Sequence, residues 1–330
     1  MTLTYEDLDR ARTAFENHHI EPPSENQCCE YAHEFIKWCR ADPAMQRYVH
    51  DLNSVTGEER PPIRTPLQVY GEKMMFAMSL LADLIGTEGI KIRDFDSLDM
   101  EEHWFRVRHA LQIVLAVPFL WSKEIATQML TNDMPRHIIS RKILSFPIVW
   151  WTFEVAHGVA NQTGTSLEGR AIDAMLIADE GVGLNVLKFG SENYPHDASC
   201  ELGGIKYGQR YPEDAPGAQN ILAGAAFLNS PYITQRQENI PRAFRRQAQR
   251  AGLPDFAQHD VRFVKLRTPE SQPSKPGDND IERDHRWWVR GHYRAQWHPS
   301  EQAHHLIWIM PHLKGPDGLP VKNPMYSVVR

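Results

Sequence analysis

The chain has 330 residues, which is enough for one large or two ordinary domains with a sizeable core. Its composition, 42% hydrophobic and 24% charged, is that of a globular protein and excludes disorder over most of the length. A net charge of −6 excludes a uniformly basic coat, so any binding of nucleic acid requires a local basic patch.

Two features of the whole chain bear on its location and cofactors. The N-terminal sequence MTLTYEDLDR is acidic and lacks a secretion signal, and the longest apolar runs, at 111–121 and 143–153, are too short to span a bilayer. We therefore expect a cytoplasmic protein with no membrane contact. The four cysteines form no repeated CxxC pair and no HExxH motif occurs, so neither a metal site nor a cofactor is expected.

The first 160 residues show the apolar spacing of helices. Helices are expected to begin near Thr4 and to cover 25–40, 67–86, 97–117, 122–132 and 136–145. Pro118 ends or kinks the helix that precedes it. This pattern predicts a helical domain over residues 1–160, whose apolar residues are explained by packing.

Residues 161–330 change character, because alternating apolar residues and turn signals replace helical spacing. Strands are expected at 171–179, 183–190, 205–211, 259–267, 287–298, 306–311 and 325–330, with loop at 194–204 and helices at 218–230 and 241–252. Residues 268–284 are poor in apolar side chains and predict a flexible segment. The fold class expected is α+β: a helical N-terminal half, then a mostly antiparallel sheet with a short basic helix.

The stretch WWVRGHYRAQWH at 287–298 has two alternating rows of side chains, one on each face of a strand. One row, nearly all apolar, is expected to be buried: Trp287, Val289, Gly291, Tyr293, Ala295 and Trp297. The other is Trp288, Arg290, His292, Arg294, Gln296 and His298. A basic row with an aromatic residue suits phosphates and stacked bases, although a solvated outer sheet face remains the alternative. Gly291 is a candidate for a β-bulge.

The predicted helix at 241–252 is the strongest charge signal in the sequence. Arg242, Arg246 and Arg250 have the i, i+4, i+8 spacing of one helical stripe, with Arg245 beside them. Like charges so close repel, which favours an anionic partner over the alternative of a solvated face. The surrounding region 236–267 is basic in an acidic protein.

Histidines are concentrated in the last 46 residues, at 285, 292, 298, 304, 305 and 312. Histidine transfers protons near neutral pH, so His292, His298 and His304 are candidate acid–base residues. Their spacing alone does not show that they converge, and the catalytic residues of an enzyme stay undetermined.

The C-terminal third of the chain also carries a resemblance. The pattern WWVRGHYRAQWHPS followed by HHLIWIMPHLKGPDGLP, with PRAFRRQAQRAGLP and VRFVKLR upstream, resembles the C-terminal part of a family of uncharacterised bacterial proteins. Members of that family are often found in plasmids, prophages and actinobacteria. The resemblance implies a mobile-element or phage-conflict setting and assigns no catalytic residue.

The sequence therefore predicts a nucleic-acid-binding protein whose arginines share one basic surface. The candidate binding residues are Arg242, Arg245, Arg246, Arg250, Trp288, Arg290, His292 and Arg294. One alternative is an enzyme acting on nucleic acid or a nucleotide through histidines, and another is a protein-interaction or inhibitor module. The choice between DNA and RNA, the sequence preference and the oligomeric state stay open.

Overall fold

The fold is taken from a computed structural model, which describes the chain in segments. These are residues 25–53, 63–82, 85–86, 91–93, 102–131, 137–138, 144, 146–159, 171–193, 197–208, 210–211, 219–230, 233–250, 260–266, 285–289, 291–300, 302–316 and 318–320. The expected helix at Thr4, the expected flexible segment 268–284 and the expected strand 325–330 lie outside the described residues.

A layer of helices covers one side of the molecule. It contains α2 (Glu25–Ala41), α3 (Pro43–Asn53), α4 (Pro66–Ala82) and α5 (Glu102–Leu115). In α2 the buried side chains Cys28, Ala32, Phe35 and Cys39 recur at helical spacing, so one face of the helix packs into the core. The spacing that predicted helices at 25–40 and 67–86 thus reflects real burial.

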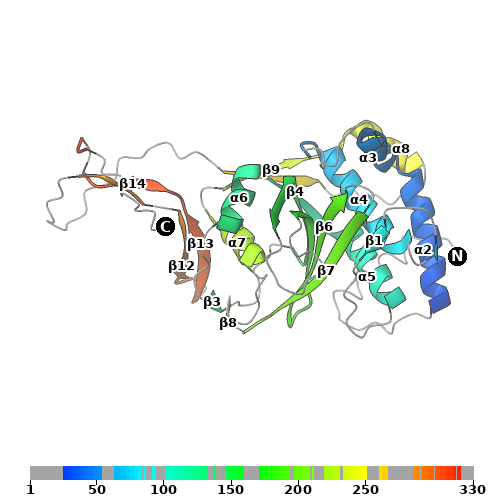
Figure 1. Ribbon diagram of the computed structural model, residues 1–330, viewed down its shortest axis with the longest axis horizontal. Helices are drawn as coiled ribbons and strands as arrows, with labels where there is room; N and C mark the ends of the chain where they lie inside the picture. Colours follow the sequence, from blue (N-terminus) through cyan, green and yellow to red (C-terminus); the bar gives the residue numbers. More distant parts are fainter. Residues whose placement is uncertain are drawn as a thin grey trace.

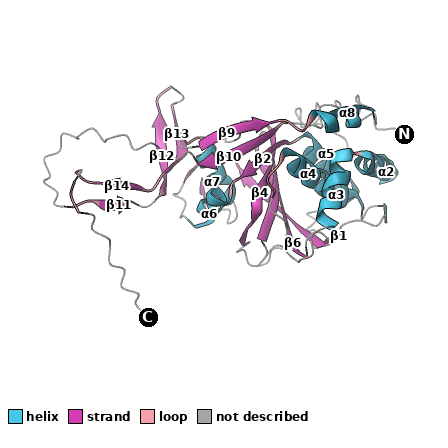
Figure 2. Cartoon of the chain, turned by 90° about the horizontal axis from the view of Figure 1, so that it is seen from above, coloured by secondary structure: helices cyan, strands magenta, loops and turns pink. Residues whose placement is uncertain are grey.

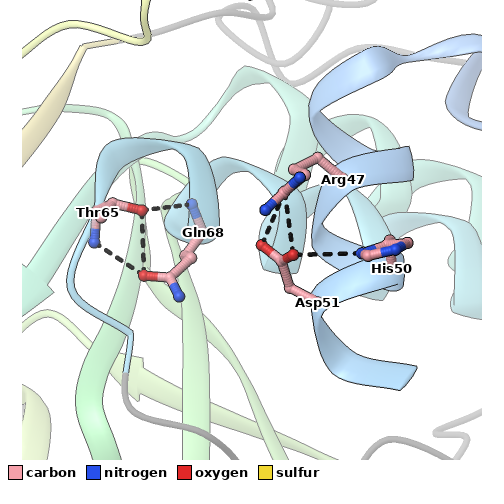
Figure 3. Close-up of polar contacts among 5 residues, drawn as sticks. All are labelled: Arg47, His50, Asp51, Thr65 and Gln68. Carbon is pink, nitrogen blue, oxygen red and sulfur yellow. Dashed lines mark hydrogen bonds and ion pairs between the residues drawn. The ribbon is translucent and has the colours of Figure 1, made fainter. Parts of the chain in front are cut away.

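Side chains at the starts of α3 and α4 satisfy backbone N–H groups that have no partner within the helix. The backbone N–H of Met45 donates to Asp42 Oδ1 at 2.9 Å, which caps α3. Before α4, Thr65 and Gln68 form a reciprocal capping box: each backbone N–H donates to the other side chain, at 3.1 and 3.3 Å (Figure 3). These caps fix where the two helices begin.

The described residues form one eight-stranded sheet, in the order β1-β7-β6-β5-β4-β2-β10-β9. The strands are β1 (Lys91–Arg93), β2 (Val117–Trp121), β4 (Ile148–Val159), β5 (Ala171–Asp179), β6 (Gly183–Asn193), β7 (Asp197–Lys206), β9 (Ile233–Glu238) and β10 (Val261–Leu266). The pairs β1–β7, β2–β4 and β2–β10 are parallel and the other pairs are antiparallel.

The sheet is therefore mixed, which corrects the expectation of a mostly antiparallel sheet confined to the C-terminal half. Strands β1, β2 and β4 come from the first 160 residues, and β4 pairs with β5 across residue 160. The expected boundary between residues 1–160 and 161–330 thus falls inside one sheet. Helix α6 (Lys123–Thr131) lies in the connection between the parallel pair β2 and β4, and a helical crossover of this kind is what allows two such strands to run parallel.

Each face of the sheet carries its own apolar core, as adjacent residues of β4 show. Trp150 packs toward α2, α4 and α5, whereas Trp151 packs toward α6 and α7 (Gln219–Leu228). Figures 1 and 2 show the sheet between these two helical layers. Helix α7 packs close to the sheet because Gly224 lies against Trp151 of β4. A Cβ on Gly224 would be 2.4 Å from the indole ring.

Short two-stranded ribbons complete the described fold. Strands β12 (His292–His298) and β13 (Ala303–Ile309) form a ribbon that packs on α7, where Tyr293, Leu306 and Trp308 join the core. Strand β11 (Trp287–Val289) pairs instead with β14 (His312–Lys314), and β3 (His137–Ile138) pairs with β8 (Arg210–Tyr211). The expected single strand over 287–298 is thus two strands. Gly291 lies between them, where a Cβ would be 2.3 Å from the Trp308 ring.

Several elements differ from those expected from the sequence. Residues 194–204, expected as loop, include most of β7, and the expected helix 136–145 contains β3. Strand β7 is rich in Asp, Ser and Gly, but pairing with β6 along its length outweighs this poor strand propensity. In the part of the chain that the structure describes, no helix is long and apolar enough to cross a lipid bilayer.

Candidate nucleic-acid interface

Helix α8 (Arg242–Arg250) follows β9 and packs beside α3. The carbonyl of Pro241 accepts hydrogen bonds from the backbone N–H groups of Phe244 and Arg245, at 2.9 and 3.3 Å, and so starts the helix. Phe244 is half-buried against the core beneath α2–α5. Because Phe244 fixes the inward face of the helix, Arg242, Arg246 and Arg250 point outward, and all three are exposed.

We call Arg242, Arg246 and Arg250 the arginine stripe. No hydrogen bond or ion pair joins any of the three to another described residue, whereas three other exposed arginines have carboxylate partners. Arg47 Nε lies 3.0 Å from Asp51 Oδ1 (Figure 3), Arg64 pairs with Glu154, and Arg236 pairs with Glu238. The fourth arginine of the helix, Arg245, is half-buried at the edge of the stripe.

The two basic residues of the neighbouring strand β10 each lie near another described side chain. On β10 the guanidinium of Arg262 lies over the Phe146 ring, 4.6 Å from its centroid, which is a cation–π contact. Lys265 is exposed but lies near Glu124, whose pKa is lowered first by its own backbone N–H and in part by Lys265. Within the described part of 236–267, the arginine stripe is the largest group of exposed arginines on one element.

The second set of candidate residues lies in the C-terminal ribbons. His292 and Arg294 are both exposed on the face of β12 that points away from α7. Trp288 belongs to β11, in a separate ribbon, and its side chain lies outside what the structure describes, as does the whole of Arg290. Of the candidate binding residues in 288–294, the structure therefore places His292 and Arg294 on one strand face.

The three histidines considered for catalysis do not converge. His292 and His298 lie at the two ends of β12, and a strand rise of ~3.4 Å per residue separates them by roughly 20 Å. His304 pairs with Trp297 on the opposite face of the ribbon, and the nearest ring to His298 is that of His305, at 4.6 Å between centroids. No pair among these three can act on the same bond in this arrangement.

Trp297 is a surface residue that the sequence placed in the buried row. Tyr293, in the same row, is 5% exposed and packs on Phe227 of α7, but Trp297 is 45% exposed. Its indole contacts the exposed imidazole of His304, with 5.1 Å between ring centroids. Alternation predicts which face of a strand a side chain joins, but it does not reveal how far α7 covers that face.

The arginine stripe and the β12–β13 ribbon lie on opposite sides of the sheet. Helix α8 lies beside α3 in the outer helical layer, whereas the ribbon lies beyond α7 on the far side of the sheet (Figures 1 and 2). The candidate residues therefore do not share the single surface expected from the sequence. They form two separate surfaces.

One further polar cluster joins α5 to the β5–β6 turn. Arg108 donates to Glu180 Oε1, and the Asn185 amide donates to the same oxygen at 3.3 Å and lies 3.4 Å from His109 Nε2. His109 Nδ1 bonds the Phe105 carbonyl at 2.8 Å, and burial lowers the pKa of His109 to about 3. The neutral imidazole of His109 is thus part of a chain of hydrogen bonds, and this fits a structural role that links α5 to the β5–β6 turn.

Comparison of the chain with known protein families, with curated proteins and with solved structures finds no match. In the described residues, no three side chains of His, Cys, Asp or Glu gather closely enough to hold a metal ion. The resemblance of the C-terminal pattern to bacterial mobile-element proteins thus stays an expectation.

Proposed function

We propose that this protein binds nucleic acid, with the arginine stripe of α8 as its principal contact with phosphates. The observation that carries the proposal is that Arg242, Arg246 and Arg250 are exposed side by side without a carboxylate partner among the described residues. Arg294 and His292 at the far ribbon would supply a second contact with the same polymer.

The physical reason for the proposal is the repulsion within the stripe. Arginines at i, i+4 and i+8 lie about 6 Å apart along a helix, which is close enough to repel each other. A polyanion removes this repulsion and releases its own counterions as it binds. Guanidinium groups also bind phosphate oxygens with two parallel hydrogen bonds, which lysine cannot do.

The first test measures how the affinity for DNA depends on salt. The variant Arg242→Gln/Arg246→Gln/Arg250→Gln is compared with the wild type, using a fluorescein-labelled duplex of about 20 base pairs and fluorescence anisotropy between about 50 and 200 mM salt. Each phosphate contact contributes about 0.9 to the slope of log affinity against log salt, so we expect the slope to fall by about 2 to 3.

A matched control separates the stripe from net charge. The variant Arg47→Gln/Arg64→Gln/Arg236→Gln removes the same number of charges from exposed arginines that pair with carboxylates. We expect it to bind nearly as the wild type does. Equal losses in the two variants, or a wild type that binds neither DNA nor RNA at low salt, would show that the proposal is wrong.

A further inference from the structure

The tip of the β12–β13 ribbon presents an aromatic surface. Of the large hydrophobic side chains that the structure describes, Val182 and Trp297 are the two that stand exposed, at 77% and 45%. Beside Trp297 lie the exposed Ala295, two residues away on the same strand face, and the exposed His304 across the ribbon. Trp297 lies outside the apolar core that Tyr293 and Trp308 join, so it does not anchor the ribbon.

The charge around this aromatic surface favours an anionic ligand. In the sequence, residues 285–320 contain four arginines and lysines and two acidic residues, Glu301 and Asp317, so this segment has a net charge of +2 in a chain whose net charge is −6. The described residues of this segment include Arg286, Arg294 and Lys314, and the last two are exposed. A planar ligand that reaches Trp297 and also carries negative charge would meet a segment of net positive charge there.

We infer that Trp297, flanked by His304, is a stacking platform for an unpaired nucleobase, which makes the ribbon selective for single-stranded nucleic acid. The inference rests on the proposed function and adds to it the class of ligand at this surface. Bases in a duplex are stacked on each other, so an exposed indole reaches the face of a base only where the strand is unpaired. Such stacking is tolerant of sequence, because every base has a flat aromatic face.

The test compares two probes and three variants. The probes are a fluorescein-labelled oligothymidine of about 20 nucleotides and a duplex of about 20 base pairs, both measured by anisotropy at low salt. The variants are Trp297→Ala, Trp297→Phe, which keeps an aromatic ring, and Val182→Ala, which removes the other exposed large hydrophobic side chain. We expect Trp297→Ala to weaken single-strand binding about 5- to 150-fold. Trp297→Phe should keep most of the wild-type affinity, and Val182→Ala should bind as the wild type does.

The outcomes separate this inference from the proposed function. Loss on the oligothymidine with unchanged duplex binding supports the platform. Unchanged single-strand binding by Trp297→Ala, while the stripe variant still loses affinity, refutes the platform alone. An equal loss on both probes, or self-association that depends on Trp297, also refutes it, because the residue then serves a different partner or a general fold role. If the wild type binds neither probe, both the platform and the proposed function are wrong.

Discussion

Lys73 is an ionisable side chain that is wholly buried inside the protein. Its side chain lies in α4, and Nζ donates hydrogen bonds to the carbonyls of Val114 and Ala116, at 2.8 and 2.7 Å. These carbonyls lie in the last turn of α5 and in the single residue between α5 and β2, where the helix leaves acceptors without intrahelical partners. Lys73 therefore links three elements, and burial lowers its pKa from 10.5 to about 7.

Because Lys73 is buried, the free energy of unfolding depends on pH in the alkaline range. Between about pH 7 and 10.5 the unfolded chain holds a proton on Lys73 that the folded chain has released, so the free energy of unfolding rises with pH in this range. The slope from this one group reaches about 1.4 kcal/mol per pH unit. Urea unfolding across this pH range should show the rise in the wild type and a smaller rise in Lys73→Met. Parallel curves for the two proteins would contradict the assignment.

At the scale of single elements, helix α7 is built for close approach to the sheet. Gly224 lies where a Cβ would be 2.4 Å from the Trp151 ring, so Gly224→Ala forces the indole or the helix to move. Overpacking of this kind costs about 1 to 3 kcal/mol, and thermal or urea unfolding should show that loss. The control Gly203→Ala adds a methyl group in β7 that meets nothing closer than 3.9 Å. Equal stability of the two variants would argue against tight packing at α7.

The elements also show what the sequence could and could not predict. The spacing of apolar side chains predicted α2, α4 and α7 and the β5–β6 hairpin, because each buries a face that its own residues define. Strands β7 and β9 depend on distant partners and carry polar or small residues, so local pattern did not reveal them. In the same way, the exposure of Trp297 and the separation of α8 from the ribbon depend on tertiary packing. The spacing of residues along the sequence does not predict such packing.

At the scale of the whole molecule, the two surfaces on opposite sides of the sheet predict a dependence on ligand length. A strand that reaches both the arginine stripe and the ribbon gains avidity of about 10² to 10⁴ over a strand that reaches one. In a series of single strands of about 10 to 60 nucleotides, we expect the affinity to rise steeply at the length that first reaches both surfaces. Removing either surface, by the stripe variant or by Trp297→Ala, should abolish the steep rise. A gradual increase in proportion to length in all proteins would mean that the surfaces act independently.

The position of β2 in the sheet has a consequence for how the chain folds. Strand β2 lies between β4 and β10, and Phe119 pairs with Arg262. On a ribosome, the N-terminal helices and β2 therefore emerge long before the strand that completes their sheet. Such high contact order slows folding, and the edge of β2 stays open to misassembly until synthesis has passed residue 266.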